Sequence, residues 1–320
     1  MKNKNNISEI KIMKKLFFAV LLFCVSITMS AQQEPMYSQY MFNMLNVNPA
    51  YAGNRAINNI TALHRNQWVN FPGHPMISTL SWDVRAGETN VGYGAQIYSD
   101  KLGIENTVGF KGYYSYHIPM GNASLSLGLS LGLLNYNADY TQSNIVDESD
   151  PAFMERTNVW LPTAGVGALY STDSWYVGLS IPALLRTKKY FNDEYRDSVN
   201  FGSTNHYFLN GGYILPLSQT VKLKPSVMLK YVIGAPLEAD FNLNAWFADR
   251  IGVGASYRTG DSVLGMVEIQ VTPQIRVGYA YDHTITQLNQ FNNGTHEIML
   301  RYEFDLSKDK SKKLLSPRYY

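Results

Sequence analysis

The sequence predicts an all-β protein, a transmembrane antiparallel β-barrel of the outer membrane with about 14 strands and an irregular N-terminal segment. Three observations support this prediction. The chain begins with the features of a secretory signal, most of the remainder alternates between apolar and small or polar residues, and the connections between these stretches differ sharply in length. Charged residues make up only 16% of the 320 residues, well below the roughly one quarter that is usual in soluble proteins.

Residues 1–31 read as a signal peptide. Lysines precede a short apolar run at 16–29, and small residues follow it, so we expect cleavage after Ala31. The only cysteine of the chain, Cys24, lies in this segment. Lipidation there would require cleavage next to the bulky Phe23, which disfavours a lipoprotein. The mature chain then contains no cysteine, which excludes disulfides, thiol nucleophiles and thiolate metal sites.

Removal of the signal also changes the sign of the net charge. Five of the 27 basic residues and one of the 25 acidic residues lie in residues 1–31, so the mature chain has a net charge of about −2. A basic stretch is left only in the tail, residues 306–320, which we expect to be periplasmic. Nucleic acid is therefore not an expected partner.

The strands are predicted by alternation with a period of two. In residues 124–133 every second residue is leucine, and serine and glycine fill the positions between. Residues 251–258 and 275–282 alternate in the same way, and the predicted barrel spans 57–305. The other expected strands are 57–66, 76–84, 91–99, 106–118, 159–171, 174–182, 204–216, 220–232, 238–248, 262–271 and 295–304.

A soluble β-sandwich also alternates, but it buries its apolar face and exposes its charges. Many polar positions here are Gly, Ser, Asn or Tyr, and the strands are too many and too long for one sandwich. A barrel in a membrane turns the apolar residues toward lipid, which is the expected environment of the outer face. The charged residues expected in the lumen are Lys111, Lys224, Lys230, Glu268, Arg276, Arg301 and Glu303. The aromatic residues expected in interfacial girdles are Trp82, Tyr114, Tyr116, Trp175 and Tyr213.

Connection lengths predict the orientation. Long connections at 138–158, 183–203 and 283–294 follow odd-numbered strands, whereas even-numbered strands end in turns of a few residues. Outer-membrane barrels keep long loops outside and short turns in the periplasm. We therefore expect both termini to be periplasmic, as an even number of strands requires.

Residues 32–56 have no period of two and form either a plug or a periplasmic segment. Asn48-Pro49 followed by Gly53 favours a capped turn. Tyr37, Tyr40, Phe42 and Tyr51 could anchor a partner protein, since aromatic residues dominate interfaces. Equally, the segment could pack inside the barrel against Lys224, Glu268 and Arg276 and contact no partner.

Three short motifs identify a possible family. Residues 36–43 read Met-Tyr-Ser-Gln-Tyr-Met-Phe-Asn, residues 48–53 read Asn-Pro-Ala-Tyr-Ala-Gly, and residues 64–68 read His-Arg-Asn-Gln-Trp. Just after a signal peptide, this combination resembles the signature of the PorP/SprF family of type IX secretion system membrane proteins from the Bacteroidetes, which commonly shows an Arg-x-Gln-Trp element. The resemblance covers 32–305. The motif residues, which are also candidate partner contacts, are Tyr37, Gln39, Tyr40, Asn43, Asn48, Pro49, Ala50, Tyr51, Gly53, Arg65, Gln67 and Trp68.

The resemblance implies an outer-membrane component or accessory of the type IX secretion system. Its implied partners are components of that system, a secreted surface adhesin, or both, and the implied role is export or surface attachment of such a protein, in some members linked to gliding motility. The alternative is an outer-membrane channel or hydrophobic-solute transporter in which residues 32–56 form a hatch.

Catalysis is not expected. The six histidines are scattered, and neither a His-Glu-x-x-His metal site nor a Gly-x-Ser-x-Gly elbow is present. Asp282-His283 is the only suggestive acid and base pair, and ordinary polar surface explains it better. We expect no catalytic residue, no cofactor, no metal and no small-molecule substrate, and we expect His117 to be a hydrogen-bonded lumen residue.

Overall fold

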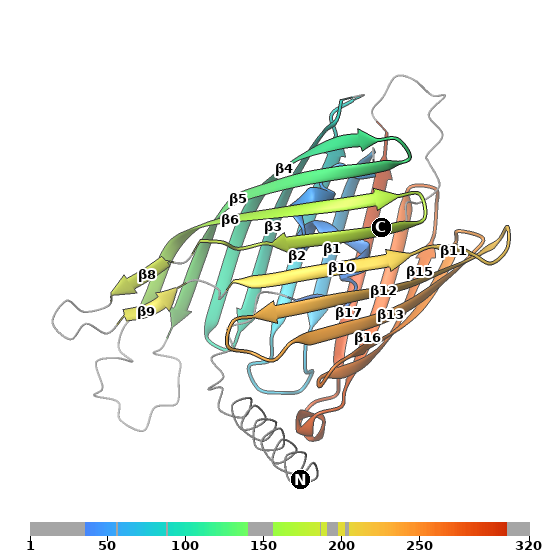
Figure 1. Cartoon of the computed structure of the whole chain (residues 1–320). Helices are drawn as coiled ribbons and strands as arrows, with labels where there is room; N and C mark the ends of the chain where they lie inside the picture. Colours follow the sequence, from blue (N-terminus) through green and yellow to red (C-terminus); the bar gives the residue numbers. More distant parts are fainter. Residues whose placement is uncertain are drawn as a thin grey trace, which may run out of the picture.

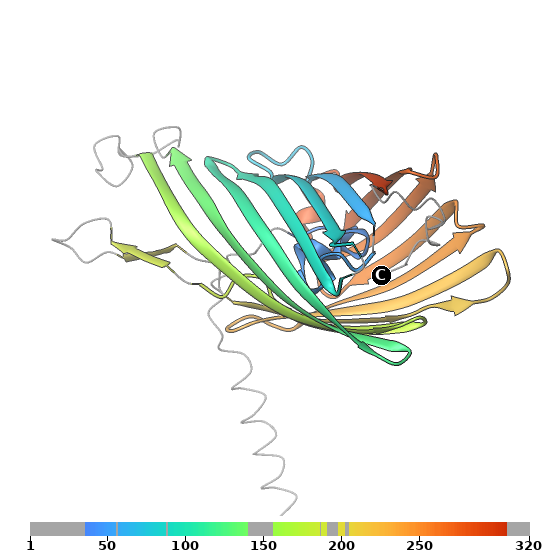
Figure 2. The same ribbon diagram turned by 90° about the horizontal axis from the view of Figure 1, so that it is seen from above.

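The computed structural model describes residues 36–55, 57–87, 89–139, 156–185, 187–190, 198–201 and 205–305. The signal segment with its cleavage site, residues 32–35 and the tail 306–320 lie outside the described residues, so those predictions are not tested. Within the described residues, fourteen antiparallel strands form a closed barrel. The predicted fold class is confirmed (Figures 1 and 2).

Each wall strand pairs with its neighbours in the sequence, and β1 pairs with β17 to close the cylinder. The two-residue strand β11 continues β10 beyond Ile214, and both pair with β12. The wall strands are β1 (Asn58–Asn66), β2 (Met76–Arg85), β3 (Val91–Leu102), β4 (Glu105–Met120), β5 (Ala123–Asp139), β6 (Arg156–Thr172), β7 (Trp175–Ile181), β10 (His206–Tyr213), β11 (Leu215–Pro216), β12 (Val221–Val232), β13 (Glu238–Phe247), β14 (Ile251–Arg258), β15 (Ser262–Gln270), β16 (Ile275–Thr284) and β17 (Thr295–Phe304).

One pair of strands was not predicted. β8 (Thr187–Tyr190) and β9 (Ser198–Phe201) form a separate two-stranded sheet within the stretch 183–203, which the sequence analysis assigned to a loop. This hairpin stands apart from the wall (Figure 1). Its pattern gave no signal because it is short and lacks the long alternation of the wall strands.

The two faces of the wall are distributed as predicted. Leu129 and Leu131 on β5 are exposed on the outside, whereas Ser126 and Ser130 on the same strand are buried inside. All seven charged residues assigned to the lumen are buried, and all five aromatic residues assigned to girdles are exposed. In water this pattern would be unfavourable, but lipid is as apolar as the outer face.

The two ends of the barrel differ. We call the end that carries the connections 67–75, 182–205 and 285–294 the long-loop end; the last of these contains the 3₁₀ turn η6 (Gln287–Gln290). The opposite, short-turn end carries tight connections such as 121–122, where Gly121 has a φ of 62°. No helix among the described residues is long and apolar enough to cross a membrane.

Residues 36–55, which we call the plug, lie inside the barrel (blue in Figures 1 and 2). They form three 3₁₀ turns, η1 (Tyr40–Phe42), η2 (Met44–Asn46) and η3 (Pro49–Tyr51). Almost every plug side chain is buried. The main apolar core is therefore in the lumen, where the plug packs against inward-facing wall residues: Leu63, Ile77, Leu169, Tyr176, Phe208, Met228, Trp246, Met266, Ala280 and Met299.

Candidate functional site in the barrel lumen

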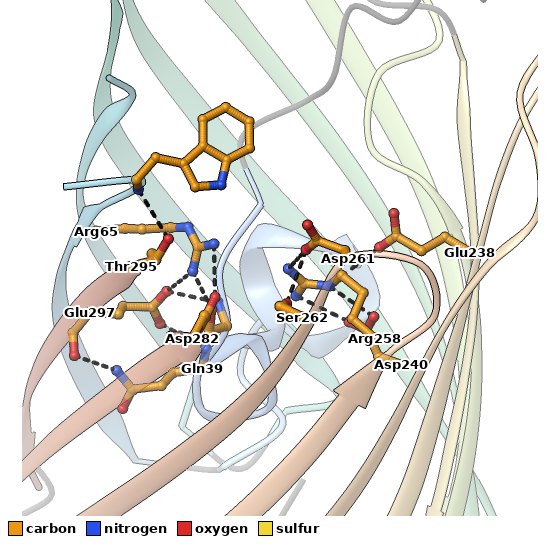
Figure 3. Close-up of polar contacts among 12 residues, drawn as sticks. Gln39, Arg65, Glu238, Asp240, Arg258, Asp261, Ser262, Asp282, Thr295 and Glu297 are labelled. Carbon is orange, nitrogen blue, oxygen red and sulfur yellow. Dashed lines mark hydrogen bonds and ion pairs between the residues drawn. The ribbon is translucent and has the colours of Figure 1, made fainter. Parts of the chain in front are cut away.

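The first contact between plug and wall is a buried ionic cluster at Arg65. The guanidinium of Arg65, on β1, lies 3.0 Å from a carboxylate oxygen of Asp282 on β16 and 3.2 Å from one of Glu297 on β17. Figure 3 shows these side chains converging in the lumen. Arg65 and Asp282 are only 2% exposed and Glu297 is fully buried, so solvent screens these charges little.

The plug completes this cluster through its own backbone. The Glu297 carboxylate accepts the backbone N–H groups of Ser38 and Gln39, each at 2.7 Å. These N–H groups come just before η1, where a helical turn leaves its first donors unpaired, and a carboxylate is a strong acceptor for them. The Ser38 hydroxyl donates to Asp282 at 2.5 Å and also contacts Arg65. We call these five residues the ionic latch.

The Asn48-Pro49-Ala50 turn forms the second contact. The Asn48 side-chain oxygen accepts the Ala50 N–H at 2.9 Å and so caps η3, with Pro49 at the first position of the turn. The Asn48 amide donates to the backbone oxygen of Ala168 on β6 at 3.0 Å. It also lies 3.4 Å from that of Leu179 on β7. One side chain therefore both folds the turn and ties it to two wall strands.

Glycines make room for this turn on three adjacent strands. A Cβ at Gly167 of β6 would overlap the Asn48 side chain, and one at Gly128 of β5 would overlap the backbone at Pro49 and Ala50. Gly178 of β7 also faces the Asn48 amide. Glycine within a strand often marks the close approach of another backbone. We call Gly128, Gly167 and Gly178 the glycine floor.

The third contact lies where the plug ends. Gly53 has a φ of 64°, which favours glycine, and its N–H donates to the Asp83 carboxylate at 3.1 Å. Its backbone oxygen accepts from Arg85 at 3.1 Å, and Arg55 pairs with Glu303 at 2.6 Å. These wall residues lie near the short-turn ends of β2 and β17.

Aromatic and amide side chains of the plug bond to the wall between these points. The Tyr40 hydroxyl accepts from Asn242 at 2.6 Å and the Tyr51 hydroxyl from Asn210 at 3.0 Å. Asn43 donates to Ser81 at 2.9 Å, and Tyr37 contacts Thr79. Both tyrosines are buried, and their hydroxyls are hydrogen-bonded to the wall.

Two of the predicted site residues lie outside the lumen contacts described above. Gln67 and Trp68 are half-buried in the connection after β1, at the long-loop end. The Trp68 N–H donates to the Thr295 hydroxyl at 3.2 Å, and its ring meets Phe71 edge-on. The structure thus brings Gln39 and Arg65, from separate motifs, to the same Glu297 carboxylate (Figure 3). Trp68 lies in the connection after β1.

Three wall residues that bind the plug, Asp282, Glu297 and Asp83, belong to none of the sequence motifs. Alternation indicates that Glu297 faces inward, but not that it meets Gln39, 258 positions earlier. Asp282 was considered only beside His283, and the structure separates the two: Asp282 is buried in the latch while His283 is exposed on the outer face. Among the described residues, no group of three or more acidic, histidine or cysteine side chains could hold a metal.

A second ionic cluster lies near the long-loop ends of β12, β13 and β14. Arg258 contacts Asp240 at 3.0 Å and Asp261 at 3.3 Å (Figure 3). Lys230 contacts Asp240 at 2.8 Å and Glu238 at 2.6 Å. The lumenal side of Lys230 was predicted, but its partners were not. Cross-strand register would have shown them, since Asp240 pairs with Arg258 and Glu238 with Lys230.

The lumen residues expected to face the plug also bond among themselves. Arg276 pairs with Glu268 at 2.7 Å, and Lys224 lies 5.0 Å from the ring centre of Tyr176. His117 is buried and bonds to Ser126 at 2.6 Å and to the plug oxygen of Ala52 at 2.9 Å. The prediction of a hydrogen-bonded lumen histidine is confirmed.

Solved structures with low sequence identity are similar to this chain. The Acinetobacter baumannii outer membrane protein Omp33 has 10% identity and a TM-score of 0.44, with 78% of this chain and 98% of that chain covered. The translocator domain of the autotransporter NalP from Neisseria meningitidis has 13% identity and a TM-score of 0.45, covering 83% and 93%. A Pseudomonas aeruginosa FadL homologue has 12% identity and a TM-score of 0.45, covering 85% and 95%. No curated protein matches.

The sequence comparison is more specific. Residues 29–302 match the family described as type IX secretion system membrane protein PorP/SprF. The match contains the plug with its Asn-Pro-Ala turn, Arg65 and nearly the whole wall, so it spans the elements that meet in the lumen. The chain belongs to the PorP/SprF family of type IX secretion system membrane proteins.

Proposed function

We propose that this outer-membrane component of the type IX secretion system works by binding proteins, and that it aids export or surface attachment of a partner such as an adhesin. The observation that supports this most is the plug, which is held to the wall from the ionic latch to the Arg55–Glu303 pair. A lumen filled in this way suits a scaffold better than an open pore.

The plug contacts are costly to break. Withdrawing the plug would take the Ser38 and Gln39 N–H donors from the buried Glu297 carboxylate, while Arg65 stays beside Glu297 on the wall. A hydrogen bond to a charged group typically contributes about 1.5–3 kcal/mol. Withdrawal would also break the Arg55–Glu303 pair. The plug is therefore not expected to leave the lumen spontaneously. This favours a barrel whose lumen is permanently plugged over the alternative function, a channel or hydrophobic-solute transporter with a hatch.

For most of the motif, burial favours a structural role. Tyr40, Asn43, Asn48 and Tyr51 bond to the plug and the wall, so we propose that they hold the plug in place and influence a partner only indirectly. Direct partner contact stays a proposal for Gln67 and Trp68 at the long-loop end. The long loops are proposed to face the cell exterior, and residues 306–320 the periplasm.

Export in cells tests the proposal. A strain that lacks this protein is complemented with the wild type, with Trp68→Ala, or with Phe110→Ala, a control aromatic residue that is 58% exposed on the outer wall. We expect the wild type and the control to restore the surface partner and Trp68→Ala to reduce it, while all three form heat-modifiable barrels. Normal surface partner in the strain that lacks the protein would refute the function.

A conductance measurement distinguishes the proposed function from the channel alternative. Purified full-length protein is compared in planar bilayers with a variant that lacks residues 32–56. The proposal expects a silent full-length protein and conductance only after deletion. Steady ion or solute flux through the full-length protein would favour the channel.

A further inference from the structure

The first residues of the plug lie at the long-loop end of the barrel. Ser38 and Gln39 bond to Glu297, the third residue of β17, and Ser38 also bonds to Asp282, two residues before the end of β16. Arg65 is the next-to-last residue of β1. All three wall positions are close to the strand ends from which the connections 67–75 and 285–294 begin or to which they lead.

Met36 lies in the same part of the lumen. It lines a small hollow together with Pro182, just beyond the end of β7, and Phe208, near the start of β10. The next residue, Tyr37, contacts Thr79 close to the start of β2. These strand ends also belong to the long-loop end.

The last residues of the plug lie at the opposite end. Gly53 bonds to Asp83 and Arg85 at the end of β2, and Arg55 pairs with Glu303 at the end of β17. The chain therefore crosses the lumen once, from the long-loop end to the short-turn end, before β1 begins.

From this path we infer that the amino terminus of the mature protein opens at the long-loop end, opposite to the carboxyl end of the barrel. With cleavage after Ala31, four residues precede Met36, and they reach at most about 14 Å. From Glu297 to Phe304 the wall runs about 24 Å along β17, or about 17 Å along the axis at a tilt of about 45°. Four residues cannot cover that distance, and the plug already fills the lumen on the way.

The inference corrects half of an expectation. With an even number of strands, the start of the first strand and the end of the last strand lie at the same end of the barrel. Asn58 indeed pairs with Phe304 at the short-turn end. That reasoning holds for the carboxyl end. It does not hold for the amino end, because the plug runs back through the lumen. If the long loops face outward, the amino terminus is displayed at the cell surface beside them.

Site-directed labelling tests the inference without assuming either the proposed function or the orientation. The mature chain has no cysteine, so single substitutions give a clean background. Three variants are treated with an impermeant maleimide, on intact cells and after permeabilisation of the outer membrane. They are Gln33→Cys near the mature terminus, Asn289→Cys at the long-loop end and Ser218→Cys at the short-turn end.

Cysteines at the outer end should react in intact cells, and cysteines at the periplasmic end only after permeabilisation. We expect Gln33→Cys to show the same one of these two patterns as Asn289→Cys, and Ser218→Cys to show the other. If Gln33→Cys instead shows the pattern of Ser218→Cys, the inference is overturned. An epitope inserted after Gln33 and probed by antibody gives the same two outcomes if the cysteine variant assembles poorly. Intact mass must show a mature chain that begins at Gln32, and a chain extended by the signal would also refute the argument.

Discussion

The outer and inner faces of the wall use alternate residues of the same strands, yet they follow different rules. Outside, Leu129 and its neighbours need only be apolar, because lipid has no specific partner for them. Inside, Arg65 meets the Ser38 hydroxyl of the plug, and Gly128 and Gly167 meet the Asn48-Pro49-Ala50 turn. The effect of a substitution on stability should therefore depend on the cost of moving the new side chain into lipid on the outer face. On the inner face it should depend on the loss of a specific partner or on steric fit with the plug.

The largest effect is expected at the ionic latch. Arg65→Ala leaves Asp282 and Glu297 buried without their cation and should destabilise the barrel by about 3–5 kcal/mol in urea unfolding in lipid. Arg156→Ala is the matched control, since Arg156 also pairs with an aspartate, Asp139, at 3.1 Å but its side chain is 73% exposed. The control should cost less than about 1 kcal/mol. A similar loss of stability in both variants would contradict the claim that the buried ion pairs matter more than the exposed one.

The lipid face comes next. Leu129→Arg should cost about 2–4 kcal/mol if the site lies near the bilayer midplane. Leu217→Arg, in an exposed turn at the short-turn end, should cost about 0–1 kcal/mol. Unfolding in lipid vesicles measures both. Ser130→Arg is not a suitable inner control, because Ser130 is only 3% exposed and arginine would overfill the site.

The glycine floor tests shape alone. Gly128→Val places atoms where the backbone at Pro49 and Ala50 lies, and overpacking of this kind typically costs about 1–3 kcal/mol. Gly265→Val is the control, because Gly265 is exposed on the outer face with open space around its Cβ position. Increased chymotrypsin cleavage of the plug in Gly128→Val alone would show that the turn has been displaced. If the plug of Gly128→Val stays as resistant to chymotrypsin as that of the wild type, the wall strand moves and the turn does not.

The smallest effect is expected at the turn cap. Asn48→Ala removes the acceptor for the Ala50 N–H and the donor to β6, and loss of such a cap costs about 0.5–2 kcal/mol. Asn135→Ala removes an amide that pairs with Asn158 in an exposed setting, and it should change stability by less than about 0.5 kcal/mol. Thermal unfolding in detergent compares the two, and equal midpoints would rule out a stabilising role for the cap.

The sequence was sufficient for the wall because lipid imposes one simple rule along every strand. The number of strands and the inward position of residues such as Lys224 and Arg301 both follow from alternation. The same rule could not predict Met228, Met266 and Met299, which face inward although they are apolar, because they pack against the plug. The ionic latch could not be predicted either, because it joins residues from β1, β16 and β17 to a segment without periodicity.

The position of the ionic latch also constrains the order of assembly. Arg65 is on the first wall strand, and Asp282 and Glu297 are on the last two, so the cluster spans the seam where β17 meets β1. Ser38 and Gln39 are synthesised before any of these partners, yet they cannot be bound until the final strands arrive. Contacts of such large sequence separation form slowly. The plug therefore forms its contacts with the wall late in assembly. Once formed, these contacts stabilise the pairing of β1 with β17 from inside the barrel.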